Sequence, residues 1–452
     1  MKKRLILIVI LCQYCFAQQP NIVFLLADDL GYGEIGAYGQ KEIQTPVLDS
    51  LAKAGIRFTN AYAGSPVCSP SRAVLMTGIT SSKNTIRGNQ GYDYKNKRLD
   101  RIPLKPTEIT IAEVLKEAGY QTGFIGKWHL DHPNQLDTWA HARGFDYAVQ
   151  EQWASPYEGK RYDEQMHWIN GKQDSVYFNL KDWSCKDEFR TTLAFDYLNA
   201  IDRQKPFFLF MSYRAPHGHG RVNSPNLYKD KGWPEKERKH AAKITLLDQQ
   251  IGRLIHKLKT MGVLDNTIVF FTSDNGPTSE GHDVHFFNSS GFLKGHKRDT
   301  YEGGIRVPFM VNWHKKIKTN QIRDCIISGQ DIMPTLAELA NTKTPQQVTG
   351  TSFIPTLFSQ NCIQRPYIHW EFQSLRKSKK SFRQAIRFDS IKVVRYGIEN
   401  PIEVYNLNQD PNEMNNKASS YSNFIDQFET IFKSDRKESN HYPYGGLPII
   451  RK

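Results

Sequence analysis

The sequence has few cysteines, no long apolar run and no repeat. Only six of its 452 residues are cysteine, and they are scattered. No apolar run reaches the roughly 20 residues that cross a bilayer, and the chain has no internal repeat or low-complexity tract. With 39% hydrophobic and 12% aromatic residues, the composition excludes a disordered chain, a collagen-like repeat and a small disulfide scaffold. We expect a large folded protein without a membrane span.

Acidic residues are fewer than basic residues in this sequence. The chain has 46 Asp and Glu against 60 Lys and Arg, a net charge of +14. This excess fits either a polyanionic partner or a merely soluble surface. The sequence contains no nucleic-acid recognition motif, so we expect no nucleic-acid partner.

The first 17 residues have the three-part pattern of a secretory signal peptide. A basic start, Lys2 to Arg4, precedes an apolar stretch over residues 5–12, and a small-residue cleavage pattern ends at Ala17. We expect cleavage near Ala17 and an exported product, periplasmic or secreted. Its net charge would be about +11, which is +14 less three basic residues.

Four cysteines remain after this cleavage: Cys68, Cys185, Cys325 and Cys362. Export permits disulfides. Four scattered cysteines in so long a chain are not a disulfide framework, and the sequence leaves open whether Cys325 and Cys362 pair.

Strand and helix patterns alternate through most of the chain. Residues 21–26, 121–125, 206–212 and 267–272 are short apolar runs typical of buried strands, and residues 46–54, 109–118 and 244–258 have helical patterns that end near glycines. This alternation predicts an α/β fold, with a large, mostly parallel sheet sandwiched between helices.

The pattern changes near the C-terminus. Residues 384–388 and 391–396 indicate a hairpin, and residues 402–407 indicate another strand. We therefore expect a signal peptide at 1–17, a catalytic domain at 18–375 and a smaller antiparallel subdomain at 376–452.

Polar side chains follow four of the predicted strands. They are Asp28 and Asp29, Lys127 and His129, His217, and Asp274 and Asn275. Any one of them has an ordinary explanation as a turn or loop residue. The carboxyl ends of parallel strands meet at one edge of a sheet, where ligands of α/β folds bind. Together the side chains predict a pocket there, with hard oxygen ligands that suit calcium or magnesium.

A segment containing Cys68 resembles a known family signature. Residues 68–78 read CSPSRAVLMTG, which is similar to the C-x-P-x-R signature of the formylglycine-dependent sulfatases. The segments ADDLGYG (27–33), GKWHL (126–130), APH (215–217), SDNG (273–276) and YEGGIRVP (301–308) resemble further motifs of this family, in the same order. The chain is thus similar to type I sulfatases of the alkaline phosphatase superfamily, and we expect a bacterial polysaccharide sulfatase.

The resemblance implies two cofactors. One is formylglycine (3-oxoalanine), made from Cys68 by a maturation enzyme, and the other is one calcium ion held by Asp28, Asp29, Asp274, Asn275 and the modified Cys68. The residues agree with a modified cysteine, because nearby carboxylates raise a thiol pKa and make a plain thiolate a poor choice. The geminal diol of a hydrated aldehyde offers a nucleophilic hydroxyl and a second one that expels the product.

The resemblance also implies roles for individual residues in cleavage of the S–O bond of a sulfate ester through a covalent enzyme-sulfate. Asp274 would accept the proton of the attacking hydroxyl, and Arg72 would fix the formylglycine. Lys127 and Lys297 would hold sulfate oxygens, with Lys294 as the alternative to Lys297.

Two histidines would move protons in this scheme. His217 would protonate the leaving alcohol, with His219 as its alternative, and His129 would deprotonate the second hydroxyl.

The substrate is less defined than the reaction. Five tryptophans suggest sugar stacking, although most of them are better explained as core or loop anchors: Trp128, Trp139, Trp153, Trp168 and Trp183. A basic stretch at 376–387 fits a sulfated polymer or a solvated loop. We expect a sulfated carbohydrate from an algal polysaccharide such as ulvan or carrageenan, rather than a glycosaminoglycan.

Two other functions are compatible with parts of the sequence. A formylglycine-dependent phosphonate or phosphodiester hydrolase shares most of these residues, whereas a polyanion-binding protein without turnover would lack some of them. Turnover of aryl sulfate and aryl phosphate esters, measured side by side, separates these functions. We expect the sulfate ester to be the better substrate; preference for the phosphate ester would favour the first alternative, and no turnover the second.

Overall fold

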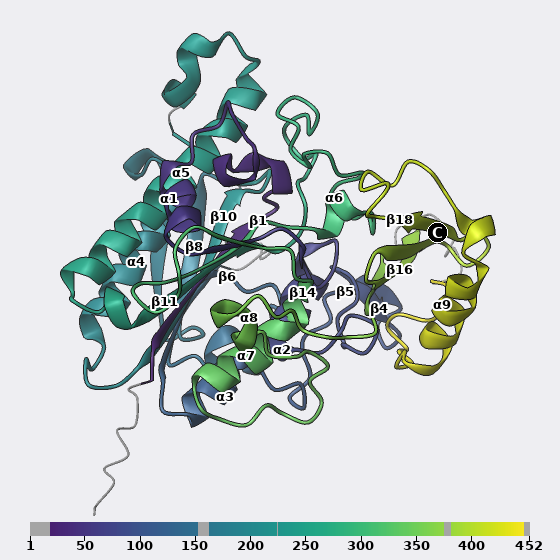
Figure 1. Cartoon of the computed structure of the whole chain (residues 1–452). Coiled ribbons are helices and arrows are strands. Elements are labelled where there is room, and N and C mark those ends of the chain that lie inside the picture. Colours follow the sequence, from purple (N-terminus) through teal and green to yellow (C-terminus); the bar gives the residue numbers. More distant parts are fainter. Residues whose placement is uncertain (1–18, 152–161, 224, 375–380, 447–452) are drawn as a thin grey trace, which may run out of the picture.

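The computed structural model describes residues 19–151, 162–223, 225–374 and 381–446 (Figure 1). The predicted signal peptide, Trp153 and residues 376–380 of the basic stretch lie outside these ranges. Within the described ranges, no helix is both long enough and apolar enough to cross a membrane.

Five parallel strands form the centre of a ten-stranded sheet. In spatial order they are β11 (Thr267–Ser273), β1 (Asn21–Asp28), β10 (Phe207–Pro216), β6 (Gln121–Lys127) and β7 (Tyr147–Glu151). Every residue of β1, β10 and β11 is buried, as is usual for parallel strands covered on both faces. The four predicted strands are confirmed, and each is somewhat longer than expected.

Antiparallel pairs extend the sheet on both sides, and a parallel pair of β2 (Ile56–Phe58) with β13 (Gln321–Arg323) forms one of its edges. Beyond β11 lie β12 (Phe309–Trp313), β2 and β13, and beyond β7 lie β8 (Glu164–Ile169) and β9 (Asp174–Asn179). β12 is antiparallel to both its neighbours, as is β8. Two short pairs lie outside this sheet, β3 (Ala61–Tyr62) with β14 (Ile327–Ser328) and β4 (Gly91–Asp93) with β5 (Arg98–Asp100).

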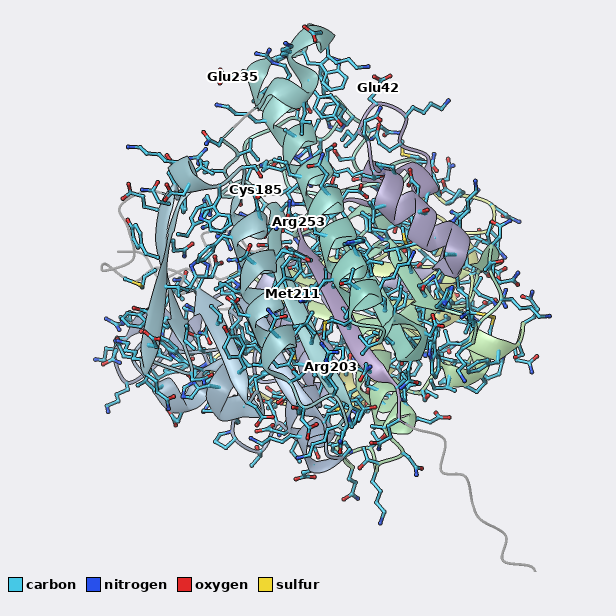
Figure 2. All side chains as sticks on the ribbon, turned by 90° about the vertical axis from the view of Figure 1, so that its left-hand side faces the viewer. Glu42, Cys185, Arg203, Met211, Glu235 and Arg253 are labelled. Carbon is cyan, nitrogen blue, oxygen red and sulfur yellow. A yellow bond between two sulfur atoms is a disulfide. The ribbon has the colours of Figure 1, made fainter. Side chains whose placement is uncertain are left out.

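Helices cover both faces of the sheet because the side chains of its strands alternate between the faces. One face, which includes Phe24, packs against α2 (Cys68–Thr77), α3 (Ile111–Glu117), α7 (Ile332–Leu339) and α8 (Ile354–Phe358). The other, which includes Leu25, packs against α1 (Pro46–Ala54), α4 (Lys186–Ala200) and α5 (Glu235–Thr260). Figure 2 looks onto α4 and α5, with Cys185 just before α4 and Met211 on the sheet behind. The predicted α/β sandwich is confirmed.

Sequence patterns place two of the helices closely and a third only in part. α1 has Pro46 in its first turn and stops before Gly55, as predicted. α3 starts two residues later than expected, because Thr110 caps it by accepting a hydrogen bond from the Glu113 amide. α5 begins at Glu235, nine residues before the predicted start, because its first turns carry mostly charged residues and lack the apolar periodicity.

A separate four-stranded antiparallel sheet lies near the C-terminus. Its order is β15 (Ile368–Gln373), β16 (Phe382–Phe388), β17 (Ile391–Tyr396) and β18 (Glu403–Asn406), which confirms the predicted antiparallel layer. β15 belongs to this sheet although it precedes residue 376, and α9 (Ser422–Ser434), which the sequence analysis missed, packs Phe428 and Phe432 against it.

The sequence did not decide whether Cys325 and Cys362 pair, and in the structure they form a disulfide. Cys325 and Cys362 are joined, with their Cα atoms 5.1 Å apart. The other described cysteines, Cys68 and Cys185, are buried free thiols.

A buried charge cluster joins the small sheet to α6 (Glu302–Ile305), which lies outside that sheet. The Lys392 ammonium of β17 lies 2.8 Å from a carboxylate oxygen of Glu302, in α6, and 2.9 Å from one of Glu413. The amide of Glu302 donates a hydrogen bond to Glu413. Burial and the neighbouring charge of Glu302 raise the pKa of Glu413 to about 7, and the charge of Lys392 offsets only part of this rise.

This cluster predicts a specific pH dependence of stability. Between pH 4.5, the ordinary pKa, and about 7, the folded chain keeps a proton on Glu413 that the unfolded chain releases. The free energy of unfolding therefore falls as the pH rises through this window, by roughly 1–3 kcal/mol from this group. Replacing Glu413 with Gln should remove that part of the slope in thermal unfolding measured from pH 5 to 8.

The matched control for this prediction is Glu429→Gln. Glu429 is a half-exposed carboxylate of the same subdomain, paired with Arg395. The Glu429→Gln variant should leave the dependence of stability on pH unchanged. If wild type and Glu413→Gln showed the same dependence of stability on pH, the prediction would be contradicted.

Candidate active site

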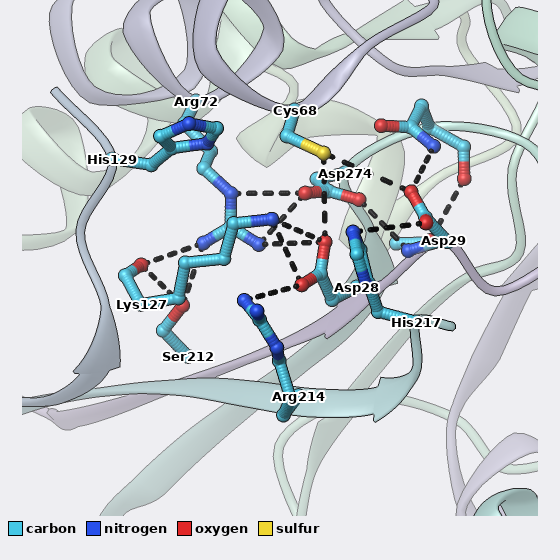
Figure 3. Close-up of polar contacts among 12 residues, drawn as sticks. Asp28, Asp29, Cys68, Arg72, Lys127, His129, Ser212, Arg214, His217 and Asp274 are labelled. Carbon is cyan, nitrogen blue, oxygen red and sulfur yellow. Dashed lines mark hydrogen bonds and ion pairs between the residues drawn. The ribbon is translucent and has the colours of Figure 1, made fainter. Parts of the chain in front are cut away.

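The four strands with polar ends are neighbours in the sheet, in the order β11, β1, β10, β6. The structure therefore brings together Asp274 and Asn275 after β11, Asp28 and Asp29 at the end of β1, His217 after β10, and Lys127 at the end of β6 with His129 beyond it (Figure 3). All of these residues are buried, and their side chains occupy one edge of the sheet.

Cys68 reaches this edge from a helix. It is the first residue of α2, which has Pro70 in its first turn and ends at Gly78 with a positive φ of 66°. The Cys68 Sγ lies 3.6 Å from Oδ1 of Asp28 and 3.8 Å from Oδ1 of Asp29. The helix start thus places the sulfur directly over the two β1 carboxylates.

The Cys68 thiol is a weak acid in this position. Burial is the main cause that raises its pKa, to about 12, and Asp274 and Asp29 add to the effect although Lys127 and Lys297 oppose it. The unmodified side chain is therefore protonated at neutral pH, and a thiol is a poor nucleophile.

Each β1 carboxylate is paired with cations. The Lys127 ammonium donates to both oxygens of Asp28 at 2.8 and 2.9 Å. The Lys297 ammonium lies 2.6 Å from Oδ2 of Asp29, and the Asn275 amide donates to Oδ1 of Asp29 at 2.8 Å. This pairing offsets the large cost of burying two adjacent carboxylates.

Arg72 connects α2 to the strand ends. Its Nε and Nη2 atoms lie 2.9 and 2.7 Å from Oδ2 of Asp274. Its Nη1 donates to the Lys127 carbonyl at 2.7 Å and to the Ser212 hydroxyl at 2.6 Å. One guanidinium therefore holds together β11, β6, β10 and the helix that carries Cys68.

The local charges give the titratable groups different states. Although burial opposes it, the charges of Lys127, Arg72 and Arg214 hold the pKa of Asp28 well below its usual range. Burial raises the pKa of Asp274 to about 6.

The two histidines are neutral in this environment. Burial lowers the pKa values of His129 and His217 well below the ordinary value, and Lys127 adds to both shifts. A neutral imidazole can accept a proton.

The donor set fits a hard divalent cation. The carboxylates of Asp28, Asp29 and Asp274 converge with the side chain of Asn275. The Asn275 Oδ1 atom is buried and has no hydrogen-bond partner among the described residues, so it is available as an oxygen ligand. Three carboxylates and an amide oxygen are the donors that calcium prefers.

The sequence analysis left two choices, Lys297 or Lys294 and His217 or His219, and in each pair the two residues lie in different places in the structure. Lys297 is buried in the cluster, whereas the Lys294 ammonium lies over the ring of Tyr301 and donates to the Glu413 carbonyl. The Nε2 atom of His217 lies 3.6 Å from Asp29. His219 is farther out, with its ring stacked on Tyr162 at 4.1 Å.

The sequence analysis missed Arg214 in this cluster. It is buried on β10, 3.4 Å from Oδ2 of Asp28 and 2.8 Å from Oε1 of Glu151. A charged residue inside an otherwise apolar strand was the available signal, because such a residue needs a buried partner.

A cavity of about 390 Å³ opens above the cluster. Its floor contains Cys68, Lys127, His129, His217 and Lys297. The remaining wall is largely polar: Asn89, Gln90, Asp100, Arg101, His219, Glu280, Arg298, Gln373 and Ser374, with Val67, Leu99, Pro133 and Phe372. The cavity can hold a small anionic group against the cluster and a larger polar group at its mouth.

The tryptophans mostly have structural positions. Trp128 and Trp139 are each 1% exposed and lie in the core, and Trp183 packs against the apolar cluster beside α4. None of the described tryptophans lines the cavity, so the stacking role is wrong for Trp128 and Trp139.

Comparison with known proteins gives consistent matches. A family model described as Sulfatase matches residues 20–342, and one described as N-sulphoglucosamine sulphohydrolase, C-terminal, matches residues 292–438. N-acetylgalactosamine-6-sulfatase of Homo sapiens is 30% identical over 432 residues, covering 88% of this chain and 81% of that protein. N-acetylgalactosamine-6-O-sulfatase of Bacteroides thetaiotaomicron is 28% identical over 493 residues, covering 92% and 93%.

Solved structures show the same likeness. The crystal structure of Ps i-CgsB in complex with k-i-k-neocarrahexaose superposes with a TM-score of 0.79 and 26% identity. The match covers 93% of this chain and 94% of that one.

The position of Arg72 predicts a large loss of stability on substitution. Arg72→Met leaves the buried carboxylate of Asp274 without its closest cation, which costs about 3–5 kcal/mol in the free energy of unfolding. Arg98→Met is the matched control, because Arg98 forms only a surface ion pair with Asp100 and should cost about 0–1 kcal/mol. Denaturant unfolding of both variants tests this, and similar small losses would contradict it.

Proposed function

This chain belongs to the sulfatase family, and we propose that it releases sulfate from a sulfated carbohydrate by means of a formylglycine made from Cys68. The carrying observation is the position of Cys68, buried above Asp28 and Asp29 at the start of α2, with its thiol protonated. A sulfuric ester hydrolase needs a nucleophile at this point, and the thiol is poorly suited to the task. A hydrated aldehyde at position 68 supplies a hydroxyl nucleophile instead.

We propose that Asp28, Asp29, Asp274, Asn275 and residue 68 hold one calcium ion. Their hard oxygen donors and the unpartnered Asn275 Oδ1 support this assignment. A cation bound there offsets the charge of the sulfate group and lowers the pKa of the diol.

Lys127 and Lys297 are proposed to bind the sulfate oxygens. Both ammonium groups are buried in the floor of the cavity, beside residue 68. In a site closed to water, such charges stabilise the negative charge that develops in the transition state.

The proton transfers use three side chains. Asp274 accepts the proton of the attacking hydroxyl, which suits its raised pKa of about 6. His129 is neutral, since its pKa lies well below the ordinary value, and it accepts the proton of the second hydroxyl. His217 donates a proton to the leaving alcohol; a bound sulfate ester brings negative charge that favours the imidazolium form.

A sulfated sugar is the proposed substrate class. The wall of the cavity is rich in hydrogen-bonding and charged side chains, which suits a hydroxylated ring. Two relatives are named for action on sulfated N-acetylgalactosamine, and a neighbouring structure holds a neocarrahexaose. We propose a carbohydrate sulfate, with ulvan and carrageenan oligosaccharides as the first candidates and a glycosaminoglycan as the alternative.

Export and domain division are part of the same proposal. We propose that residues 1–17 are removed, that the mature enzyme acts outside the cytoplasm, and that residues 18–375 and 376–452 form its two domains. The disulfide between Cys325 and Cys362 supports an oxidising compartment.

The formylglycine assignment predicts a defined chemical change. Peptide mass spectrometry of the active enzyme should find residue 68 as an aldehyde that has lost sulfur, and Cys68→Ala should lose at least about 1,000-fold in kcat. Cys185→Ala is the control, because Cys185 is a buried thiol outside the cavity. An active enzyme whose Cys68 keeps its sulfur would overturn the mechanism.

The role of His217 predicts a dependence on the leaving group. His217→Asn should lower kcat by about 100- to 10,000-fold for a sugar sulfate, whose alcohol needs a proton as it leaves. The loss should be much smaller for 4-nitrophenyl sulfate, because nitrophenolate leaves unassisted. His219→Asn should change KM more than kcat with both substrates. Equal losses for both substrates in His217→Asn would rule out the general-acid role.

The substrate class is tested by sulfate release. Ion chromatography of reactions with ulvan and carrageenan oligosaccharides and with sulfated N-acetylgalactosamine should detect free sulfate from at least one. The Cys68→Ala variant provides the blank. Good turnover of aryl sulfates with no release from any sugar would exclude a carbohydrate substrate.

A further inference from the structure

A second buried cluster of metal-ligand side chains lies away from the cavity. It contains Glu34, His240 and His282, which come from three separate parts of the chain. Glu34 ends the short 3-10 helix η1 (Tyr32–Glu34) that follows β1, His240 lies in α5, and His282 lies in the loop that leads from β11 to Lys297. None of the three lines the cavity of the active site.

The side chains of this cluster are in close contact. One potential ligand atom from each of the three residues lies within 4.8 Å of the other two. The Nε2 atom of His240 lies 2.6 Å from Oε1 of Glu34. The rings of His240 and His282 are stacked, with their centroids 3.4 Å apart and their planes at 13°.

A second carboxylate borders the cluster. Oε2 of Glu237 lies 3.9 Å from Nδ1 of His282. Glu34, Glu237 and His240 are completely buried, and His282 is 5% exposed. Four polar side chains therefore meet in the dry interior, where each needs a polar partner.

Some polar atoms of the cluster have no hydrogen-bond partner among the described residues. Nδ1 of His240 and Oε2 of Glu237 are buried and form no hydrogen bond with any described residue. A buried acceptor without a partner costs about 1–3 kcal/mol. Unpartnered polar atoms on two members of the cluster are in keeping with a ligand that binds several lone pairs at once.

We propose that Glu34, His240 and His282 bind a zinc ion, with Glu237 as the fourth ligand. Two imidazoles and two carboxylates form a neutral complex with a divalent ion. Donors of a tetrahedral zinc site lie about 3.3–3.5 Å apart, given zinc–ligand distances of about 2.0–2.2 Å. The His240 Nε2–Glu34 Oε1 distance of 2.6 Å and the His282 Nδ1–Glu237 Oε2 distance of 3.9 Å lie on either side of this value. Binding therefore requires the stacked rings to turn until their in-plane lone pairs converge on the ion.

Zinc fits the cluster better than calcium does. Calcium takes six to eight oxygen ligands, whereas two of the four side chains here offer nitrogen. Imidazole and carboxylate together suit zinc and neighbouring transition metals. The chain would thus hold two metals of different classes in separate sites.

The position of the site suggests what the ion does. Oε2 of Glu34 accepts a hydrogen bond from the Gly31 amide at 2.7 Å, in the loop that follows Asp28 and Asp29. On α5, Lys243 donates to the carbonyls of Pro216 and His217. An ion shared by Glu34, His240 and His282 would cross-link the loop after Asp28 and Asp29, the loop that leads to Lys297, and α5, whose Lys243 holds the backbone at His217, and so stabilise their arrangement.

The experiment measures metal binding rather than activity. The mature chain is prepared with the substitution Cys68→Ala, so that zinc cannot bind to the thiol of the other cluster, and is saturated with calcium. It is then titrated with Zn²⁺ against a chromophoric chelator, and with Co²⁺ as a spectroscopic probe. We expect one tight site per chain, visible absorption bands typical of tetrahedral Co²⁺, and a rise of Tm on zinc loading.

Variants assign the ion to these residues. His282→Gln and, independently, Glu34→Gln should weaken zinc binding by more than about 100-fold while circular dichroism stays unchanged. His285→Gln is the matched control, since His285 is exposed in the same loop, and it should bind zinc as the parent does.

Three results would overturn the proposal. They are a parent protein without a tight zinc site, a Co²⁺ spectrum of octahedral type, and unchanged zinc affinity in His282→Gln. The Co²⁺ spectrum of the parent decides the question even if a variant fails to fold. None of these results depends on the formylglycine or on the sulfatase reaction.

Discussion

Charge compensation at the carboxyl edge of the central sheet is the constraint on which the rest of the structure depends. Parallel pairing places Asp28, Asp29 and Asp274 side by side in a buried position. Isolated buried carboxylates are very costly, so the fold has to bring cations to the same place. Lys127 and Lys297 do this from β6 and from the loop after β11.

The same constraint fixes the position of the reactive residue. Arg72 pairs with Asp274 and also binds the backbone of β6, and it lies one turn after Cys68 in α2. The ion pair that neutralises Asp274 therefore also sets the helix that places the sulfur over the carboxylates. The surroundings that suit a cation and a sulfate group keep the unmodified thiol protonated, which is the chemical argument for the conversion to an aldehyde that we propose.

Sequence patterns predicted the parts of this protein that depend on local order. The apolar runs located β1, β6, β10 and β11, because fully buried parallel strands are apolar on both faces. The edge strands β8 and β9 were missed, since their residues are partly exposed. The helix α9 was missed although its apolar residues have a clear helical spacing. The polar residues after the strands were found because strand ends meet at one edge, whereas Arg214 was missed inside an apolar strand.

The sequence alone determined the class of the protein. The strand and helix alternation, the residues after the strands and the motif around Cys68 are local features, and they were sufficient for the α/β fold and the sulfatase family. Only the tertiary structure decided which charges compensate which, that Lys297 rather than Lys294 faces Asp29, that Cys325 pairs with Cys362, and that Glu34, His240 and His282 meet. The physical reason is that these pairings join residues far apart in the chain, and no local pattern records which distant segments the packing of the core brings into contact.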